Sequence, residues 1–197
     1  MAEAWRCFVA VPIGPDLRQE LADAVDVLRR ERPELDQSWR WNEPEAWHIT
    51  LAFLGTTPSD EVPRVADQVA GAVESHEPFP LAGGGMGAFP SRRAGRVLWY
   101  GIHDPERRLR DLARDVRAAL GLETTAPFHP HLTLGRTRHR HGTPVGSLLD
   151  AVSLPPGRLV VDRALLFRSH LGSGPVRYQM LADAPLRQAT AVRRGPA

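Results

Sequence analysis

The chain has 197 residues, of which 42% are hydrophobic and 24% are charged, and its formal net charge is +2. This composition excludes a disordered chain, and the single cysteine, Cys7, excludes a fold held by disulfides. No apolar run approaches the roughly 18 residues of a membrane span, and the first residues lack a signal-peptide pattern. We therefore expect a cytoplasmic protein with no membrane partner.

The hydrophobic pattern changes repeatedly between strand and helix periodicity. In chain order it predicts a strand at 5–13, a helix at 15–32, a short extended piece at 39–41, a strand at 47–54, a helix at 60–75, an irregular glycine-rich strand at 78–90, a strand at 96–102, a helix at 104–120, a strand at 131–137, a short helix at 144–150 and two strands at 158–170 and 174–182. This order predicts an α+β fold with mostly antiparallel sheets. We expect a single domain over 1–187 and a flexible tail over 188–197.

One short phrase occurs twice, as His48-Ile49-Thr50-Leu51 and His131-Leu132-Thr133-Leu134. Successive side chains of a strand alternate between its faces, so each copy places a histidine and a threonine together, backed by apolar residues. A third His-x-Thr triplet, at 141–143, lies in a turn that contains Gly142. The spacing alone is therefore weak evidence, and the strand context distinguishes the two copies.

Two imidazoles and two hydroxyls suit the cleavage of a phosphodiester by in-line displacement. One histidine accepts a proton from the attacking water, and the other gives a proton to the departing oxygen. Imidazoles titrate near neutral pH, so one can be neutral while the other is charged. The catalytic candidates are His48 and His131, and Thr50 and Thr133 are candidates to donate hydrogen bonds to the phosphate oxygens.

The stretches 48–55 and 128–136 resemble the double His-x-Thr signature of the 2H phosphoesterase superfamily. More narrowly they resemble the RNA 2′,3′-cyclic phosphodiesterases, also described as 2′-5′ RNA ligases, and the resemblance extends over about 5–182. It implies a bilobal domain with pseudo-twofold symmetry, in which the two motifs face each other across a central cleft with helices outside. We expect a monomer.

The resemblance also implies an activity. It implies a hydrolase that opens a terminal 2′,3′-cyclic phosphate to a 2′-phosphate without a metal ion or cofactor, with reversible 2′-5′ ligation as the related reaction. The expected partners are RNA ends or small nucleotides that carry this phosphate. By the same resemblance, His131 activates the water and His48 protonates the leaving oxygen.

Two neighbours of the motifs are further candidates. Arg136 matches the arginine that contacts phosphate in this family, yet strict alternation places it opposite His131, so a bulge near Gly135 is needed to turn it back. Trp41 is a candidate to stack on a terminal base, with core packing as the alternative. We expect core packing for three other aromatic residues, which are Trp47, Phe53 and Trp99.

Other functions stay open at this point. The same fold and histidines suit ADP-ribose cyclic phosphate or a 2′-5′ oligonucleotide, and the arginine-rich turn at 138–141 suits a nonenzymatic RNA-binding module. Four histidines lie between 129 and 141, which is the pattern that favours a metal site. No aspartate, glutamate or cysteine lies between 124 and 149, and the turn is rich in arginine, so we expect no metal.

Overall fold

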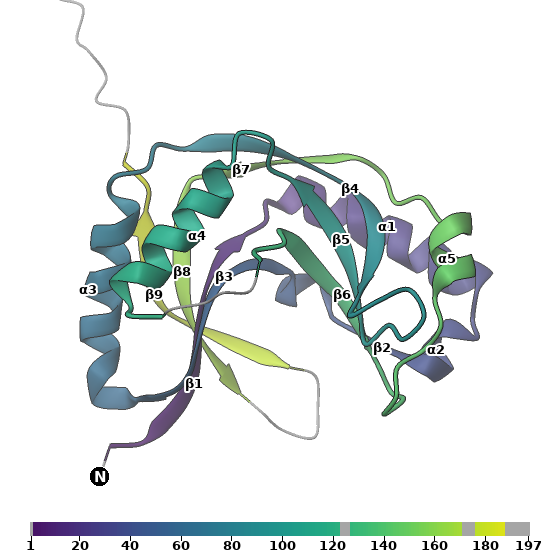
Figure 1. The fold of residues 1–197 in the computed structure, drawn as a ribbon, viewed down its shortest axis with the longest axis horizontal. Coiled ribbons are helices and arrows are strands. Elements are labelled where there is room, and N and C mark those ends of the chain that lie inside the picture. Colours follow the sequence, from purple (N-terminus) through teal and green to yellow (C-terminus); the bar gives the residue numbers. More distant parts are fainter. Residues whose placement is uncertain (1, 123–126, 171–175, 188–197) are drawn as a thin grey trace, which may run out of the picture.

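A computed structural model describes residues 2–122, 127–170 and 176–187 (Figure 1). The helices are α1 (Pro15–Glu31), α2 (Leu35–Ser38), α3 (Val62–Val73), α4 (Arg108–Ala119) and α5 (Gly146–Ala151). The strands are β1 (Ala4–Pro12), β2 (Trp39–Trp41), β3 (His48–Pro58), β4 (Phe79–Phe89), β5 (Val97–His103), β6 (His131–Thr137), β7 (Gly157–Val161), β8 (Arg163–His170) and β9 (Arg177–Pro185). Short 3-10 turns precede β3 and α3.

The strands form one antiparallel sheet in the order β7-β4-β5-β6-β3-β1-β8-β9, with β2 paired to β6. The β6/β3 junction divides the sheet into β7, β4, β5 and β6 with β2 on one side and β3, β1, β8 and β9 on the other, and Figure 1 shows the two groups diverging from it. At the junction, β3 and β6 share the paired position Ile49–Leu132. The α+β class with antiparallel strands is confirmed, and the two groups of strands belong to one continuous sheet.

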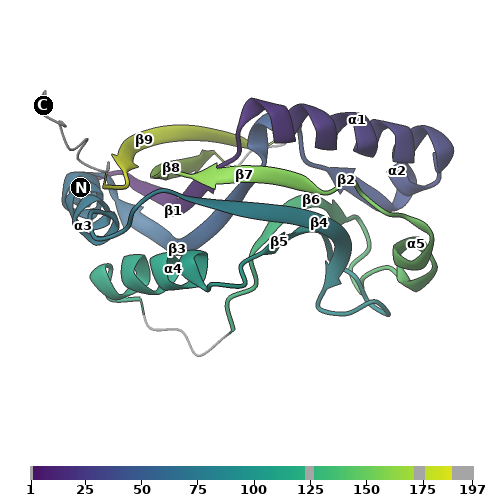
Figure 2. The same ribbon diagram turned by 90° about the horizontal axis from the view of Figure 1, so that it is seen from above.

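Helices cover the two groups of strands separately (Figure 2). Helices α3 and α4 pack against each other and against β3, β8 and β9, whereas α1 packs against β7. Each long helix buries an apolar stripe at helical spacing, such as Val65, Val69 and Val73 in α3. The main core includes residues of both groups of strands, among them Val9 and Leu132.

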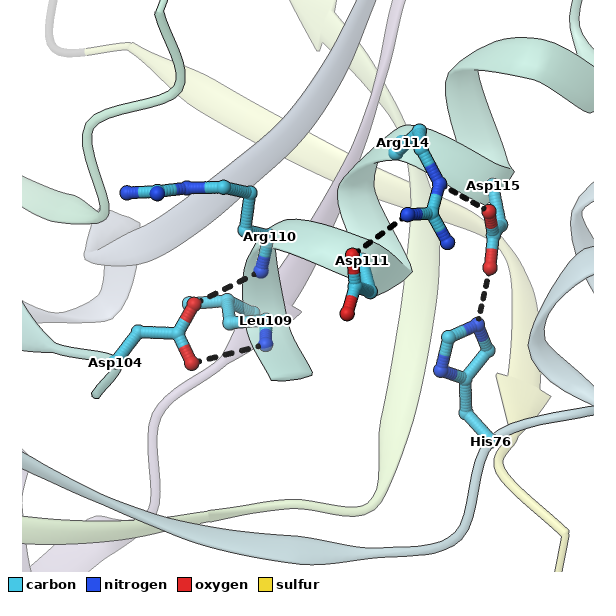
Figure 3. A network of polar contacts seen from close by, with 7 residues as sticks. All are labelled: His76, Asp104, Leu109, Arg110, Asp111, Arg114 and Asp115. Carbon is cyan, nitrogen blue, oxygen red and sulfur yellow. Dashed lines mark hydrogen bonds and ion pairs between the residues drawn. The ribbon is translucent and has the colours of Figure 1, made fainter. Parts of the chain in front are cut away.

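Helix α4 begins later than predicted because of Asp104. The Asp104 carboxylate accepts hydrogen bonds from the backbone N–H groups of Leu109 (3.2 Å) and Arg110 (2.9 Å), as Figure 3 shows. These donors have no partner inside the first turn, so the carboxylate satisfies them and complements the helix dipole. Further along α4, Asp115 contacts His76 at 3.0 Å and Arg114 at 2.8 Å.

Three strand predictions were wrong in their bounds. The strand expected over 174–182 is β9, three residues later, and positions 174 and 175 lie outside the described residues. The strand expected over 158–170 is divided at Asp162 into β7, which pairs with β4, and β8, which pairs with β1. The chain crosses here from one end of the sheet towards the other, which hydrophobic periodicity does not reveal. Strand β3 continues to Pro58, because 55–58 pair with the first residues of β1. The tail expected at 188–197 lies outside the described residues.

Within the described ranges, no helix is both long enough and apolar enough to cross a membrane.

Candidate active site

The two copies of the repeated phrase lie side by side at the centre of the sheet. Ile49 pairs with Leu132, and both side chains are buried in the core. The residues before and after this pair therefore project from the opposite face of the sheet. His48, Thr50, His131 and Thr133 all line one cavity of about 440 Å³ on that face.

Backbone carbonyls hold the two imidazoles in the same way. The Nδ1 atom of His48 lies 2.8 Å from the Ala46 carbonyl oxygen, and the Nδ1 atom of His131 lies 2.6 Å from the His129 carbonyl oxygen. A carbonyl oxygen only accepts, so Nδ1 carries the proton and donates it in both residues. Each neutral histidine therefore has an unprotonated Nε2, which is the atom available for proton transfer.

A bulge in β6 brings Arg136 into the cavity. In the pairing of β6 with β5, Leu98 is opposite Gly135 and Trp99 is opposite Thr133, so Leu134 is an extra residue. Leu134 and Gly135 are consecutive buried residues, and the exposed Arg136 lines the cavity with His131. The bulge that was expected near Gly135 is therefore present, and it reverses the alternation of side chains after Thr133, so that Arg136 faces the cavity.

A matching bulge in β3 corrects the prediction for Phe53. In the pairing with β1, Val9 is opposite Ala52 and Ala10 is opposite Thr50, so Leu51 is the extra residue. The alternation is reversed, and Phe53 is 65% exposed and lines the cavity. The expectation that Phe53 packs in the core was wrong. The sequence held one signal that Phe53 belongs to the site: Phe53 follows His48 by five residues, just as Arg136 follows His131.

Two residues that sequence reasoning missed hold the bulges. Asn42 donates its backbone N–H to the Leu134 carbonyl oxygen at 2.8 Å and its side-chain amide to the Thr133 carbonyl oxygen at 3.0 Å. Arg117 of α4 donates Nε–H to the Leu51 carbonyl oxygen at 2.7 Å, and burial lowers the pKa of this guanidinium. Both side chains satisfy carbonyls where the bulges interrupt the regular ladder.

Burial dominates the electrostatics of the histidines. The His48 ring packs against Phe8 (4.8 Å between ring centroids) and Tyr178 (5.1 Å). Desolvation lowers the pKa of His48 to about 4, with smaller effects of His131 and Arg136 in the same direction. Desolvation also lowers the pKa of His131, again helped by Arg136. Both imidazoles are therefore neutral at pH 7 in the unliganded cavity.

The cavity is suited to an anion. Its lining includes the guanidinium groups of Arg6 and Arg136, together with the hydroxyls of Thr50 and Thr133, and no carboxylate of the described residues is among its lining side chains. An anionic ligand placed here favours the charged form of a histidine and raises its pKa. The arrangement can therefore bind a phosphodiester and supply both a proton acceptor and a proton donor.

Trp41 lies outside this cavity. Its Nε1–H donates to the Asp36 carboxylate at 2.8 Å, and its ring lines a neighbouring cavity that shares Asn42 and Val176 with the central one. Trp47 is buried, as expected. Trp99 is half-buried and lines a further cavity beside His131. Over the residues that the structure describes, no three potential metal ligands gather at one point.

Comparison with known proteins places the chain in a family. Residues 17–173 match the family model described as the 2′-5′ RNA ligase superfamily. An RNA 2′,3′-cyclic phosphodiesterase of Methanothermobacter thermautotrophicus is 30% identical over 89% of this chain and 96% of the relative. One of Thermus thermophilus is 32% identical over 92% and 90%. A relative of the same name from Geobacillus stearothermophilus is longer, and the chain spans 59% of its length.

Solved structures agree in fold. A Thermus thermophilus protein, TT0787, superposes with a TM-score of 0.73 at 26% identity, covering 94% of this chain and all of the other. Escherichia coli LigT, solved with 3′-AMP, gives a TM-score of 0.71 at 26% identity over 93% and 99% of the two chains. The chain therefore belongs to the 2′-5′ RNA ligase superfamily.

Proposed function

We propose that this protein is an RNA 2′,3′-cyclic phosphodiesterase that uses His48 and His131 as its acid–base pair. The observation that carries the proposal is the matched pair of imidazoles, each fixed by an Nδ1–H···O=C bond and each lining one cavity with Arg136. The relatives' names supply the substrate class, and the nucleotide bound to the LigT neighbour is consistent with it.

The reaction is a hydrolysis with a tethered leaving group. Water attacks phosphorus and gives a proton to one imidazole while the P–O3′ bond breaks. The other imidazole protonates the departing 3′-oxygen, which leaves a 2′-phosphate. Thr50 and Thr133 donate hydrogen bonds to the non-bridging oxygens, and Arg136 stabilises the charge that gathers on them. Ligation uses the same ring opening with a 5′-hydroxyl in the place of water: the P–O3′ bond breaks, the 5′-oxygen bonds to phosphorus, and a 2′-5′ linkage results.

Burial lowers the pKa of both histidines, so both are neutral at pH 7 and the lowered pKa by itself does not separate their roles. We assign the general base to His131 and the general acid to His48, in agreement with the family resemblance. An anionic phosphate beside His48 raises its pKa towards the range in which it donates a proton.

Leaving-group chemistry tests this assignment. An activated phosphodiester with a nitrophenolate leaving group needs little help from an acid, whereas a sugar alkoxide needs a proton. We expect the His48→Ala variant to recover much of its loss on the activated substrate and the His131→Ala variant to recover little. Equal recovery, or recovery by His131→Ala alone, contradicts the assignment but leaves the pair itself intact.

The activity is tested with a short RNA ending in a 2′,3′-cyclic phosphate, in the presence of a chelator. We expect a 2′-phosphate product and continued turnover, because acid, base and oxyanion donors all come from side chains. Removing either histidine should lower kcat by about 10²–10⁴-fold, whereas His141→Ala, an exposed residue of the 138–141 turn, should match the wild type. Turnover that survives loss of both histidines refutes the proposal.

We extend the proposal to a single-domain, monomeric, cytoplasmic enzyme. In support, the main core draws on both groups of strands, and one copy of the chain supplies both histidines, both threonines and Arg136 to the central cavity, so the site needs no residue of a second copy. Cys7 is a buried free thiol, which suits a reducing compartment. Size-exclusion chromatography with light scattering tests the monomer, and a dimer that persists on dilution contradicts it.

A further inference from the structure

A second cavity, of about 370 Å³, adjoins the central one beside His131. The two cavities share the side chains of Phe89 and His131 in their linings. A ligand that extends past His131 therefore reaches the second cavity from the first. Its volume lies in the range of small-molecule sites, about 300–1,000 Å³.

Ring systems form much of the lining of this second cavity. The centroid of the Phe89 ring lies 5.3 Å from that of Trp99, 5.9 Å from that of His129 and 5.0 Å from that of His131. His103 and His129 add two exposed imidazoles. No aspartate, glutamate or arginine of the described residues lines the cavity, so its chemistry is aromatic and uncharged.

Glycine backbone completes the lining. The pairing of β4 with β5 passes from Gly83 to Met86, and Gly84 and Gly85 have no paired residue in β5 or β7. Gly85 has a φ of 72°, which a glycine adopts without strain. These two residues bring backbone without side chains to this part of the wall, so a planar ligand can approach it closely.

We propose that this second cavity binds the unpaired nucleobase of the nucleotide next to the one that carries the reacting phosphate. The inference rests on the proposed function, because it takes the central cavity to hold the cyclic phosphate. Unpaired bases stack on aromatic side chains, and their edges form hydrogen bonds with side chains and backbone. The second cavity supplies the rings of Phe89 and Trp99, the imidazoles of His103 and His129, and a wall of glycine backbone at Gly84 and Gly85.

The charge distribution separates the roles of the two cavities. The central cavity has Arg6 and Arg136 and suits the phosphate, whereas the second cavity has no cationic side chain that is permanently charged. A phosphate in the second cavity would lose its hydration without a fixed counter-charge. A metal ion would find imidazoles but no carboxylate there, and no cluster of three ligands occurs in the described part of the chain. A neutral, flat base fits both findings.

Chain-length dependence tests the proposal. A mononucleoside 2′,3′-cyclic phosphate occupies the central cavity alone, whereas a dinucleotide with the same terminus adds a second base. We expect the wild type to show a KM about tenfold lower for the dinucleotide, since stacking of one base on aromatic rings contributes on that scale. The His103→Ala variant should lose most of this difference while its kcat/KM on the mononucleotide changes less than about threefold.

A control and a second substrate identify the source of the base. His139→Ala removes an exposed imidazole that lines neither cavity, and it should keep the wild-type preference. The lower KM can appear with the cyclic-phosphate dinucleotide, in which case the bound base belongs to the 5′ neighbour. If the lower KM appears only with a 2′-5′-linked dinucleotide, and His103→Ala removes it, the bound base belongs to the nucleoside on the far side of the phosphate.

The failures of the two proposals are distinguishable. A wild type that is active on the mononucleotide but shows no preference with either dinucleotide overturns the second-cavity proposal and leaves the enzyme function standing. A dinucleotide preference that the His103→Ala variant retains in full also overturns it. A wild type that hydrolyses no cyclic phosphate overturns the function, and the second-cavity proposal with it.

Discussion

Phe53 and Arg136 occupy equivalent positions in the two halves of the sheet. Each follows a motif histidine by five residues, each comes after a one-residue bulge, and both line the cavity that contains His48 and His131. The repeat therefore covers the backbone as well as the histidines and threonines. The two positions differ in chemistry, because one presents an exposed aromatic ring and the other a guanidinium.

Phe53 offers a test of this asymmetry. We expect Phe53→Leu to raise KM for RNA by about five- to tenfold with little change in kcat, because a stacking surface is lost while the acid–base pair is intact. Phe53→Tyr retains the ring and should keep KM within about twofold of the wild type. Steady-state kinetics of both variants decides the matter, and a fall in kcat alone would contradict a binding role.

Loss of Arg136 should have a different kinetic signature. Arg136→Met removes the charge but keeps much of the side-chain volume, and we expect kcat/KM to fall by at least about a hundredfold, since oxyanion donors contribute on that scale. Arg158→Met, in the edge strand β7 and remote from the cavity, is the matched control. A loss of less than threefold in Arg136→Met would place this guanidinium outside the reaction.

The buried His48 makes stability depend on pH. The pKa of His48 is lowered from 6.5 to about 4 in the folded state, so between these values the unfolded chain binds more protons than the folded one. The contribution of His48 to the free energy of unfolding is therefore fully present above about pH 6.5 and is lost as the pH falls towards 4. We expect this group to lower the free energy of unfolding by about 2 kcal/mol between pH 7 and pH 5.

Urea unfolding of the wild type and His48→Gln at both pH values measures this effect. The variant lacks the titrating group, so its change in stability between pH 7 and pH 5 should be smaller by about the same 2 kcal/mol. Equal pH dependence in the two proteins would show that the His48 pKa is not lowered in the folded state.

Arg117 is expected to position β3 from the core side of the sheet. In Arg117→Met the Leu51 carbonyl oxygen loses its side-chain donor, and an unsatisfied buried carbonyl costs about 1–3 kcal/mol. We expect lower stability and a fall in kcat, with Arg117→Lys restoring part of both. The control is Arg114→Met on the same helix, whose ion pairs with Asp111 and Asp115 are exposed and contribute little (Figure 3). Similar losses in the two methionine variants would contradict a specific role of Arg117.

The Asp104 cap separates stability from catalysis. Asp104→Ala removes the acceptor of two backbone N–H groups at the start of α4, and we expect a loss of about 0.5–2 kcal/mol. The carboxylate lies outside the central cavity, so kcat and KM at a temperature well below the melting point should stay within about twofold of the wild type. Thermal unfolding and kinetics on the same sample measure both quantities.

The local pattern of the sequence determined which residue types share a strand face. The alternation in 48–51 and 131–134 placed each histidine with its threonine and backed them with Ile49 and Leu132, and the resemblance carried by these stretches predicted the family. Helical spacing predicted the long helices, because a stripe of apolar residues every three or four positions suits one buried face. These properties depend on neighbours in the chain, which a sequence displays directly.

Only the tertiary structure decided what depends on pairing between distant strands. The phase of β3 after Leu51 is set by its register on β1, so alternation alone placed Phe53 in the core, and only the register brings it to the cavity. Arg136 faces the cavity because β6 is bulged against β5, and Asn42 and Arg117 reach the bulges from other elements. A bulge leaves no mark in the composition of a strand, yet it moves the side chains that follow it to the opposite face of the sheet, as far as the next irregularity.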